Sequence, residues 1–187
     1  MKKIMFNDAL GLTAAVLSGR KTMTRRVVSF SENDAAIYSN LTDAEREAML
    51  PVIIDRYSRY QVGERVAIAQ AYKDVFLPGF FEHLPKSAIN NKMFVKAEFM
   101  PNKIDITDIQ IQRLQDISED DCLKEGIQEL APCSECGSPM YYFSDFNDGW
   151  WFFDPREAFE GLMYRLFHRD LWKENPWVFV YTFKLVK

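Results

Sequence analysis

Residues 177–186 carry the pattern that most limits how this chain can fold. Large apolar side chains alternate there with smaller or polar ones, in the order Phe179, Val180, Tyr181, Thr182, Phe183, Lys184 and Leu185. A repeat of two residues is typical of a β-strand, because successive side chains of a strand point to opposite faces of a sheet. We therefore predict a strand that is paired within a sheet and buried on one face.

Shorter apolar segments along the chain predict further strands. We expect an extended segment at 21–28, where β-branched residues are frequent, and strands at residues 3–6, 65–71, 93–99 and 104–114. Helices are predicted between them. The sequence thus indicates an α+β fold, with a mostly antiparallel sheet or small barrel and flanking helices.

Capping residues mark two helices in the first third of the chain. An Asn or Asp at 7–8 can cap a helix that Gly19 ends. Thr42 and Glu45 form the capping box of a second helix. Pro51 is expected to break or kink that helix, because proline lacks a backbone N–H.

Two more helices are predicted in the second half. Ser118 caps a short helix that runs through Glu125 and stops at Gly126. Asp154 followed by Pro155 opens the last helix. The apolar positions of that helix lie three or four residues apart, at Phe159, Leu162, Met163, Leu166 and Phe167.

Composition places the chain among soluble globular domains. Of its 187 residues, 48% are hydrophobic and 27% are charged, which fits neither a fibrous nor a disordered protein. No apolar run approaches the roughly 20 residues needed to cross a bilayer. The N-terminus does not resemble a secretory signal, and three cysteines cannot all pair within the chain. We therefore expect one domain over residues 1–187, reduced thiols, a cytoplasmic location and no membrane partner.

Positive charge is concentrated at the N-terminus of an otherwise acidic chain. The first 26 residues contain six Lys and Arg residues against one Asp, a net charge of +5, so the other 161 residues sum to −9 and the whole chain to −4. This cluster predicts a basic site for RNA or for a nucleoside or nucleotide ligand, with Gly19, Arg20, Lys21, Arg25 and Arg26 as binding residues. The alternative is a solvated basic corner without a ligand.

Three side chains are candidates for catalysis. A lysine whose pKa is lowered by burial or by neighbouring arginines can act as a base, and Lys21 precedes the Thr24 hydroxyl by three residues. Glu125 stands near the C-terminal end of its predicted helix, where the helix dipole disfavours negative charge. This position requires a reason beyond helix stability, such as a functional role for Glu125. The alternative is that Glu125 is a lone, exposed side chain without a function.

Cys133 and Cys136 form a Cys-x-x-Cys-Gly loop, which is half of a tetrahedral zinc site. The sequence has no second such pair, and Cys122 or His168 can complete the site only if the fold brings them close. We therefore expect no cofactor. A reduced thiol pair is the default interpretation, and a structural zinc is the less favoured alternative.

The N-terminal motif resembles that of a known family. Gly19, Lys21 and Arg26 form a Gly-x-Lys-x-x-x-x-Arg pattern after a short strand and helix, and this pattern is similar to the signature of the ASCH domain, a relative of the PUA RNA-binding fold. Three further segments resemble parts of the family. Residues 60–66 resemble its entry to a barrel strand, and residues 109–121 resemble its strand followed by an acidic helix. Residues 175–183 resemble the closing strand of its longer phage and prophage members. Two segments look like insertions, residues 29–58 and 128–150.

The resemblance carries expectations about fold and chemistry. It implies a small closed β-barrel with helices over its openings and a cleft that suits RNA or a nucleotide. One branch of the family consists of amidohydrolases that deacetylate N4-acetylcytidine. Carried onto this sequence, that branch implies Lys21 as the base, Thr24 as the nucleophile and Glu125 as the proton donor. Arg25 or Arg26 would lie beside a developing oxyanion or a phosphate.

Three functions stand as hypotheses. The first is an RNA- or nucleotide-binding protein, and the second is an amidohydrolase acting on an acylated nucleoside. The third is a phage accessory protein that binds another protein through its aromatic insertion, which includes residues 150–153. Ala69 and Gln70 stand where phage-type relatives tend to have an Arg-Glu pair, and this departure bears on the activity rather than on the fold.

Overall fold

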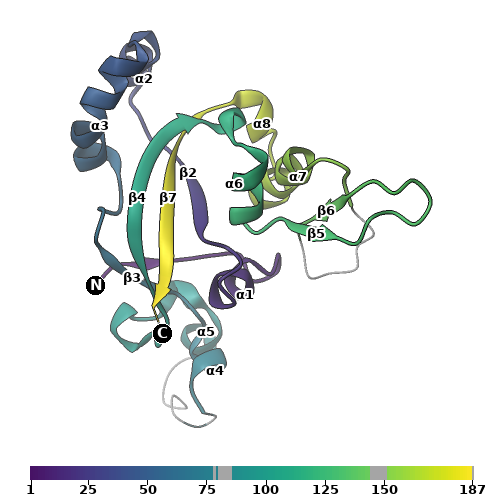
Figure 1. Ribbon diagram of the computed structural model, residues 1–187. Coiled ribbons are helices and arrows are strands. Elements are labelled where there is room, and N and C mark those ends of the chain that lie inside the picture. Colours follow the sequence, from purple (N-terminus) through teal and green to yellow (C-terminus); the bar gives the residue numbers. More distant parts are fainter. Residues whose placement is uncertain (78, 80–85, 144–150, 187) are drawn as a thin grey trace.

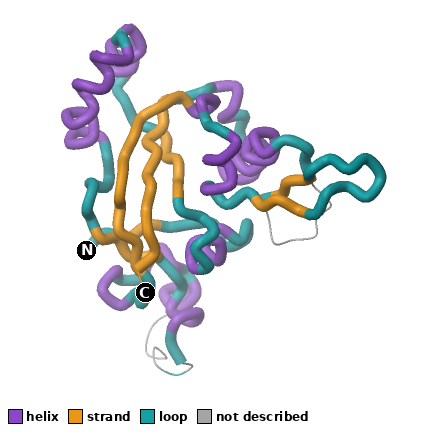
Figure 2. Tube along the Cα trace, viewed as in Figure 1, coloured by secondary structure: helices purple, strands orange, loops and turns teal. Residues whose placement is uncertain are grey.

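A five-stranded sheet lies at the centre of the fold in the computed structural model, which describes residues 1–77, 79, 86–143 and 151–186 (Figures 1 and 2). The order of its strands is β1-β3-β4-β7-β2. The strands are β1 (Lys3–Ile4), β2 (Met23–Val27), β3 (Arg65–Ile68), β4 (Lys103–Arg113) and β7 (Trp177–Val186). Only β1 and β3 pair in parallel, so the prediction of a mostly antiparallel sheet in an α+β fold is confirmed.

The pair of β4 and β7 forms the long curved centre of the sheet (Figure 1). It runs from Lys103 opposite Val186 to Arg113 opposite Trp177, with an irregularity between Ile106 and Asp108. The strands predicted at 104–114 and 177–186 are therefore confirmed. Residues 3–6 and 65–71 form strands over only part of the predicted lengths.

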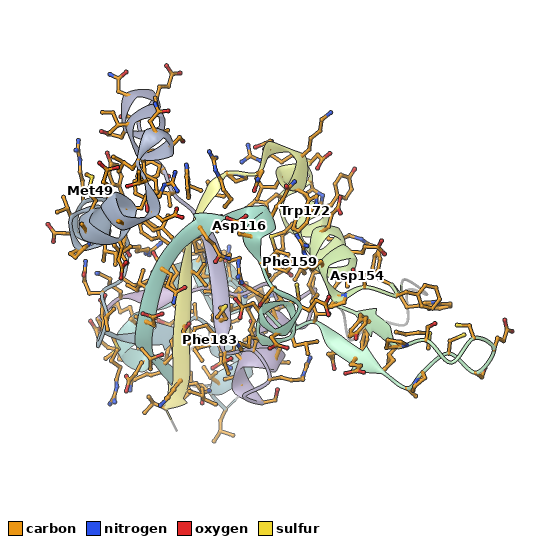
Figure 3. All side chains as sticks on the ribbon, turned by 45° about the horizontal axis from the view of Figure 1, so that its top comes forward. Met49, Asp116, Asp154, Phe159, Trp172 and Phe183 are labelled. Carbon is orange, nitrogen blue, oxygen red and sulfur yellow. The ribbon has the colours of Figure 1, made fainter. Side chains whose placement is uncertain are left out.

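Strand β7 departs from the prediction that it is buried on one face. Tyr181 and Phe183 are buried as expected, and the Phe183 ring lies 5.9 Å from that of Phe6 (Figure 3). Val180 is also buried. Val180 lies opposite Arg25 of β2, and the Arg25 side chain contacts α6 and α7 on the other face of the sheet. Both faces of the sheet are therefore covered around Val180.

Helices and a small hairpin surround the sheet (Figure 1). α6, α7 and α8 lie together beside the sheet, α2 and α3 project at one end, and the two-stranded sheet of β5 and β6 points away from α7. The bounds are α1 (Leu12–Leu17), α2 (Glu32–Asn40), α3 (Asp43–Tyr57), α4 (Tyr72–Val75), α5 (Lys86–Asn90), α6 (Glu119–Lys124), α7 (Pro155–Phe167), α8 (Leu171–Glu174), β5 (Gln128–Leu130) and β6 (Met140–Tyr142). Three 3-10 turns complete the regular structure, Lys92–Phe94, Ala97–Phe99 and Leu114–Asp116.

The capping residues begin helices where the sequence predicts them. The Thr42 hydroxyl accepts from the backbone N–H of Glu45, and the Glu45 carboxylate accepts from that of Thr42. Ser118 caps α6 by accepting from the backbone N–H of Asp121, and Asp154 caps α7 by accepting from that of Arg156. Pro51 does not break its helix, because α3 continues through it to Tyr57, and a kink at Pro51 stays a prediction.

Two other local predictions are wrong. Residues 93–99 form 3-10 turns instead of a strand, and the Lys3 ammonium accounts for part of this change. It donates to the carbonyl oxygens of Met93 (2.6 Å) and Val95 (2.8 Å), which a strand would use in a ladder. The first helix begins only at Leu12. Asn7 instead caps the turn before this helix, because its side-chain oxygen accepts a hydrogen bond from the Leu10 N–H.

The predicted closure into a barrel is not tested by the strand pairing. Among the described strands β1 and β2 form the two edges of the sheet. One side-chain bond joins these edges, from Arg26 Nη2 of β2 to the carbonyl oxygen of Met5 just after β1, at 2.8 Å. Within the part of the chain that the structure describes, no helix has both the length and the apolar character needed to span a membrane.

Candidate functional site

Four charged side chains form a buried cluster between β2 and α6. The Lys21 ammonium donates to Glu125 Oε2 at 2.6 Å, and Arg25 Nη1 donates to Glu125 Oε1 at 3.1 Å. Arg25 Nη2 also donates to Asp121 Oδ2 at 3.1 Å. Lys21, Arg25 and Glu125 are 2%, 6% and 2% exposed. The buried charges of Lys21 and Arg25 are therefore paired with carboxylates, as buried ions require. Asp121 lies at the edge of the cluster, where its side chain is 22% exposed and also pairs with Lys124 at 2.9 Å.

Local backbone bonds bring Lys21 to this place. The N–H of Lys21 donates to the Ala15 carbonyl near the end of α1, and the next N–H, that of Thr22, donates to the Lys124 carbonyl at the end of α6. The two helix ends thus meet at the start of β2. Gly126 follows α6 at a φ of +106°, a backbone conformation that a glycine adopts without strain and that other residues rarely adopt.

The position of Glu125 at the end of α6 now has a physical reason. It is the C-cap residue of that helix, where its charge opposes the helix dipole. The Lys21 ammonium offsets this by donating both to the Glu125 carboxylate and to its backbone carbonyl, the latter at 2.5 Å. The carbonyl is one that the helix leaves without an intrahelical partner.

Burial lowers the pKa of the Lys21 ammonium below its usual 10.5, and the charges of Arg26 and Arg25 act in the same direction. The carboxylate of Glu125 acts in the opposite direction but does not outweigh burial. The amine therefore loses its proton more readily than that of an exposed lysine. This is the property that a lysine base requires.

The buried cluster opens onto a cavity of about 310 Å³. Its polar wall consists of Lys21, Thr24, Arg25, Arg26, Lys92 and Glu125, and its apolar wall comes mainly from α7 and from residues 5–7. This volume lies at the small end of the range of ligand cavities, so it suits a small molecule rather than a long polymer. The structure thus brings all three predicted catalytic residues to one cavity.

Thr24 is the predicted nucleophile, and its side chain is 4% exposed. It lies on β2 opposite Tyr181, two residues before Arg26, so Thr24 and Arg26 share one face of the strand. Its hydroxyl forms no hydrogen bond with any described residue. Because Thr24 lines the cavity, that hydroxyl is available to a ligand.

Not all predicted binding residues line this cavity. Gly19 ends α1 with a φ of +79°, and Arg20 lines a separate shallow hollow with residues of α6 and β5. Lys21 and Arg25 line the cavity but are neutralised by carboxylates. Arg26 is the lining cation that has no carboxylate partner among the described residues.

The two cysteines of the predicted half zinc site lie in the turn between β5 and β6. The Cys133 N–H donates to the Ser138 carbonyl, and the Gly137 N–H donates to the Cys133 carbonyl. Among the described residues, no group of three or more His, Cys, Asp or Glu side chains is placed to hold a metal ion. Cys122 is buried under α6, and burial raises the pKa of its thiol to about 12.

The sequence analysis missed several side chains that complete the site. Asp121 was assigned only to the first turn of α6, and Gln112 of β4 was not considered. With its amide oxygen turned toward Arg25, Gln112 accepts from Nη2 at 2.7 Å and from Nε at 3.2 Å. The Phe159 ring of α7 lies 5.9 Å from the Arg25 guanidinium carbon (Figure 3 shows its place). No short-range pattern could have indicated Gln112 or Phe159.

Of the aromatic segment, residues 151–153 are described, and 147–150 lie outside the described part. Trp151 and Phe153 are each 55% exposed, whereas Phe152 stacks on Phe143 at 6.0 Å. The third hypothesis, a protein partner for this segment, stays a prediction.

Comparisons with known proteins give one structural match. No family model matches the sequence, and no curated protein matches it. The chain is similar to the crystal structure of an ASCH domain from Lactobacillus crispatus JV V101, with 14% sequence identity and a TM-score of 0.38 over 93% of this chain and 69% of that one. That structure carries the name of the family whose motifs this sequence resembles.

Proposed function

We propose that the protein is a hydrolase that binds a nucleoside or nucleotide in this cavity and removes an acyl group from the amine of its base. One observation carries the proposal. The hydrogen-bonded pair of Lys21 and Glu125 lines the same cavity as the Thr24 hydroxyl, which has no partner among the described residues. A nucleophile, a base and an acid thus face one ligand-sized space.

The pair of Lys21 and Glu125 can supply both proton-transfer groups without gaining or losing a proton. Transfer of one proton along their 2.6 Å hydrogen bond converts ammonium and carboxylate into a neutral amine and a carboxylic acid. Burial favours the neutral amine of Lys21, because desolvation penalises its ammonium form. The amine can then accept the proton of Thr24, and the acid can protonate a leaving nitrogen.

The proposed reaction has two halves. Thr24 Oγ1 attacks the acyl carbon while its proton passes to Lys21, and the carbon–nitrogen bond breaks as Glu125 protonates the nitrogen. An acyl ester of Thr24 remains. Water then gives a proton to the Glu125 carboxylate and attacks the ester, and Thr24 recovers its proton from Lys21 as the acid leaves. Arg26 is the cation that can stabilise the oxyanion in both halves.

A second candidate function is ligand binding without chemistry. The observation that favours it is the double engagement of Lys21, whose ammonium contacts both the carboxylate and the backbone carbonyl of Glu125. A lysine held in this manner also serves to join β2 to α6. The cavity would then bind a nucleotide or the end of an RNA strand.

A panel of acylated nucleosides separates the two candidates. Purified protein is incubated with nucleosides carrying acyl groups on their base amines, N4-acetylcytidine among them, and products are read by mass spectrometry. Binding of the same compounds is measured by calorimetry. Release of the acyl group supports the hydrolase. Binding without turnover supports the second candidate, and neither binding nor turnover contradicts both.

The pH dependence of turnover tests the role of Lys21. The active pair of neutral amine and carboxylic acid holds as many protons as the ion pair, so turnover should be level at lower pH and fall once the pair loses a proton, at a pH below 10.5 because the pKa of Lys21 is lowered. Arg26→Gln removes a nearby positive charge that lowers this pKa, so the falling limb should move to higher pH. The measurement is kcat between about pH 6 and 10.

A matched control uses Arg56→Gln, which removes a positive charge on α3 outside the cavity and should leave the limb in place. A limb that Arg26→Gln does not move would argue against Lys21 as the base.

A further inference from the structure

A second cavity lies on the other side of Arg26. It has a volume of about 270 Å³ and is bounded by the end of α3, the loop at 58–60 and strands β1, β2 and β7. Met5 and Arg26 line both cavities. The bond from Arg26 Nη2 to the Met5 carbonyl holds the guanidinium at their boundary. The two cavities therefore share Arg26 and Met5 as their common boundary.

The walls of the second cavity are cationic and aromatic. Arg26 and Arg59 contribute two guanidinium groups, and Tyr57, Tyr60 and Tyr181 contribute rings. The Arg59 guanidinium carbon lies 5.8 Å from the Tyr60 ring. No Asp or Glu is among the described residues that line the cavity. The cavity wall is therefore positively charged, and none of its described residues carries a negative charge that would neutralise it.

The nearest carboxylates are already engaged elsewhere. Asp34 accepts hydrogen bonds from the hydroxyls of Ser31 and Tyr57 and lies 3.8 Å from Arg56 Nη2. Glu64 accepts from the Lys2 ammonium at 3.1 Å. Over the described ranges, neither Arg26 nor Arg59 has an ion pair with a carboxylate. Their remaining N–H donors are thus free for an anionic ligand.

The tyrosines give the cavity fixed walls. The Tyr60 hydroxyl donates to the Lys3 carbonyl at 3.0 Å, and the Tyr181 and Ser58 hydroxyls are 2.9 Å apart. The two rings meet edge to face at 5.3 Å. Burial raises the pKa of both phenols, so they stay neutral and add no negative charge at neutral pH.

We propose that the second cavity binds the phosphate of a ligand whose base occupies the first cavity, so that the ligand is a phosphorylated nucleoside. This inference rests on the proposed function and narrows its ligand class. Guanidinium groups bind phosphate oxygens through paired N–H donors, and Arg26 and Arg59 supply two such groups. In the first cavity the charges of Lys21 and Arg25 are balanced by Glu125 and Asp121, so Arg26, which lines both cavities, is the cation without a carboxylate partner that its described residues share with the second.

Calorimetry with cytidine and cytidine 5′-monophosphate tests the phosphate subsite independently of turnover. The wild-type protein should bind the monophosphate at least about tenfold more tightly than cytidine. Arg59→Gln should reduce this ratio about tenfold, because it removes one charged donor from the phosphate. Arg56→Gln is the matched control. It removes an exposed arginine three residues away that does not line the cavity, and the ratio should be unchanged.

The outcomes separate failure of this inference from failure of the proposed function. Equal binding of cytidine and its monophosphate overturns the phosphate subsite, and so does an Arg59→Gln variant with the wild-type ratio. Either result leaves hydrolysis of free nucleosides intact. Conversely, a phosphate preference that Arg59→Gln lowers supports the subsite even if no acylated compound is hydrolysed.

A further arm distinguishes two sources of the phosphate. Short RNA oligonucleotides that end in cytidine are compared with the mononucleotide under the same salt. Tighter binding of the oligonucleotide identifies the end of an RNA strand as the ligand, and tighter binding of the mononucleotide identifies a free nucleotide. Inorganic phosphate should compete with cytidine 5′-monophosphate but not with cytidine, and competition with both contradicts the subsite.

Discussion

Replacing Glu125 with alanine should lower the free energy of unfolding by about 3–5 kcal/mol. The change removes the carboxylate that both Lys21 and Arg25 contact, and these cations are almost entirely buried. A buried charge without its partner keeps the desolvation cost and loses the attraction that offset it. Urea denaturation followed by circular dichroism measures the effect.

Two variants act as controls for this prediction. Glu125→Gln keeps the shape and one acceptor oxygen, so it should lose less stability than the alanine variant. Glu119→Ala removes an exposed carboxylate from the first turn of the same helix and should barely move the denaturation midpoint. If Glu125→Ala is no less stable than Glu119→Ala, the buried cluster does not hold α6 against β2.

A double mutant identifies the interaction itself. Lys21→Ala combined with Glu125→Ala should destabilise the protein by less than the sum of the two single changes, because each single change leaves the other charge unpaired. Additive losses would show that the two side chains stabilise the fold independently. This measurement also separates pairing from the effect of removing side-chain volume.

The sequence indicated Glu125 for a physical reason that the structure explains. A negative charge at the C-terminal end of a helix is unfavourable, so the position of Glu125 already required a reason beyond helix stability. The sequence could not say which cation, since Lys21 and Glu125 are 104 residues apart. Their contact depends on the ends of α1 and α6 meeting at β2, which is a property of the whole fold.

Charge counting misled in one respect. The first 26 residues carry a strong positive excess, which predicts an exposed basic patch. In the structure Lys21 and Arg25 face carboxylates of α6, and Lys92 at the same cavity pairs with Asp8 at 2.8 Å. Counting along the chain cannot detect such pairing. Arg26 keeps its charge without a carboxylate partner among the described residues, and it shares a cavity with Arg59, which comes from a different part of the sequence.

Local sequence patterns predicted helices and strands correctly where the residues of a segment determine its conformation by themselves. The alternation in β7 and the caps of α3, α6 and α7 lie in segments whose own residues fix the conformation. Residues 93–99 were misassigned because a distant side chain, that of Lys3, takes their carbonyl groups. The strand propensity of residues 93–99 carries no information about a hydrogen-bond donor as distant in sequence as Lys3.

Replacing Thr24 with alanine should lower turnover by at least about 10³-fold if the protein acts as the proposed hydrolase. The change deletes the hydroxyl that faces the cavity and leaves the buried cluster of Lys21 and Glu125 in place. Single-turnover kinetics with an acylated nucleoside, read by mass spectrometry, measures the loss. Thr24→Ser keeps the hydroxyl and should retain most of the activity.

Thr22→Ala is the matched control for this variant. Thr22 precedes β2 in the same segment, but its side chain does not line the cavity, and its backbone bonds to Lys124 and Phe183 do not involve the hydroxyl. The variant should therefore turn over at the wild-type rate. Trapping adds a readout that a structural role cannot produce, because the proposed acyl ester adds the mass of the acyl group to Thr24. Full activity in Thr24→Ala, or turnover without such an adduct under rapid quenching, would mean that water attacks the acyl carbon directly, with Lys21 activating it.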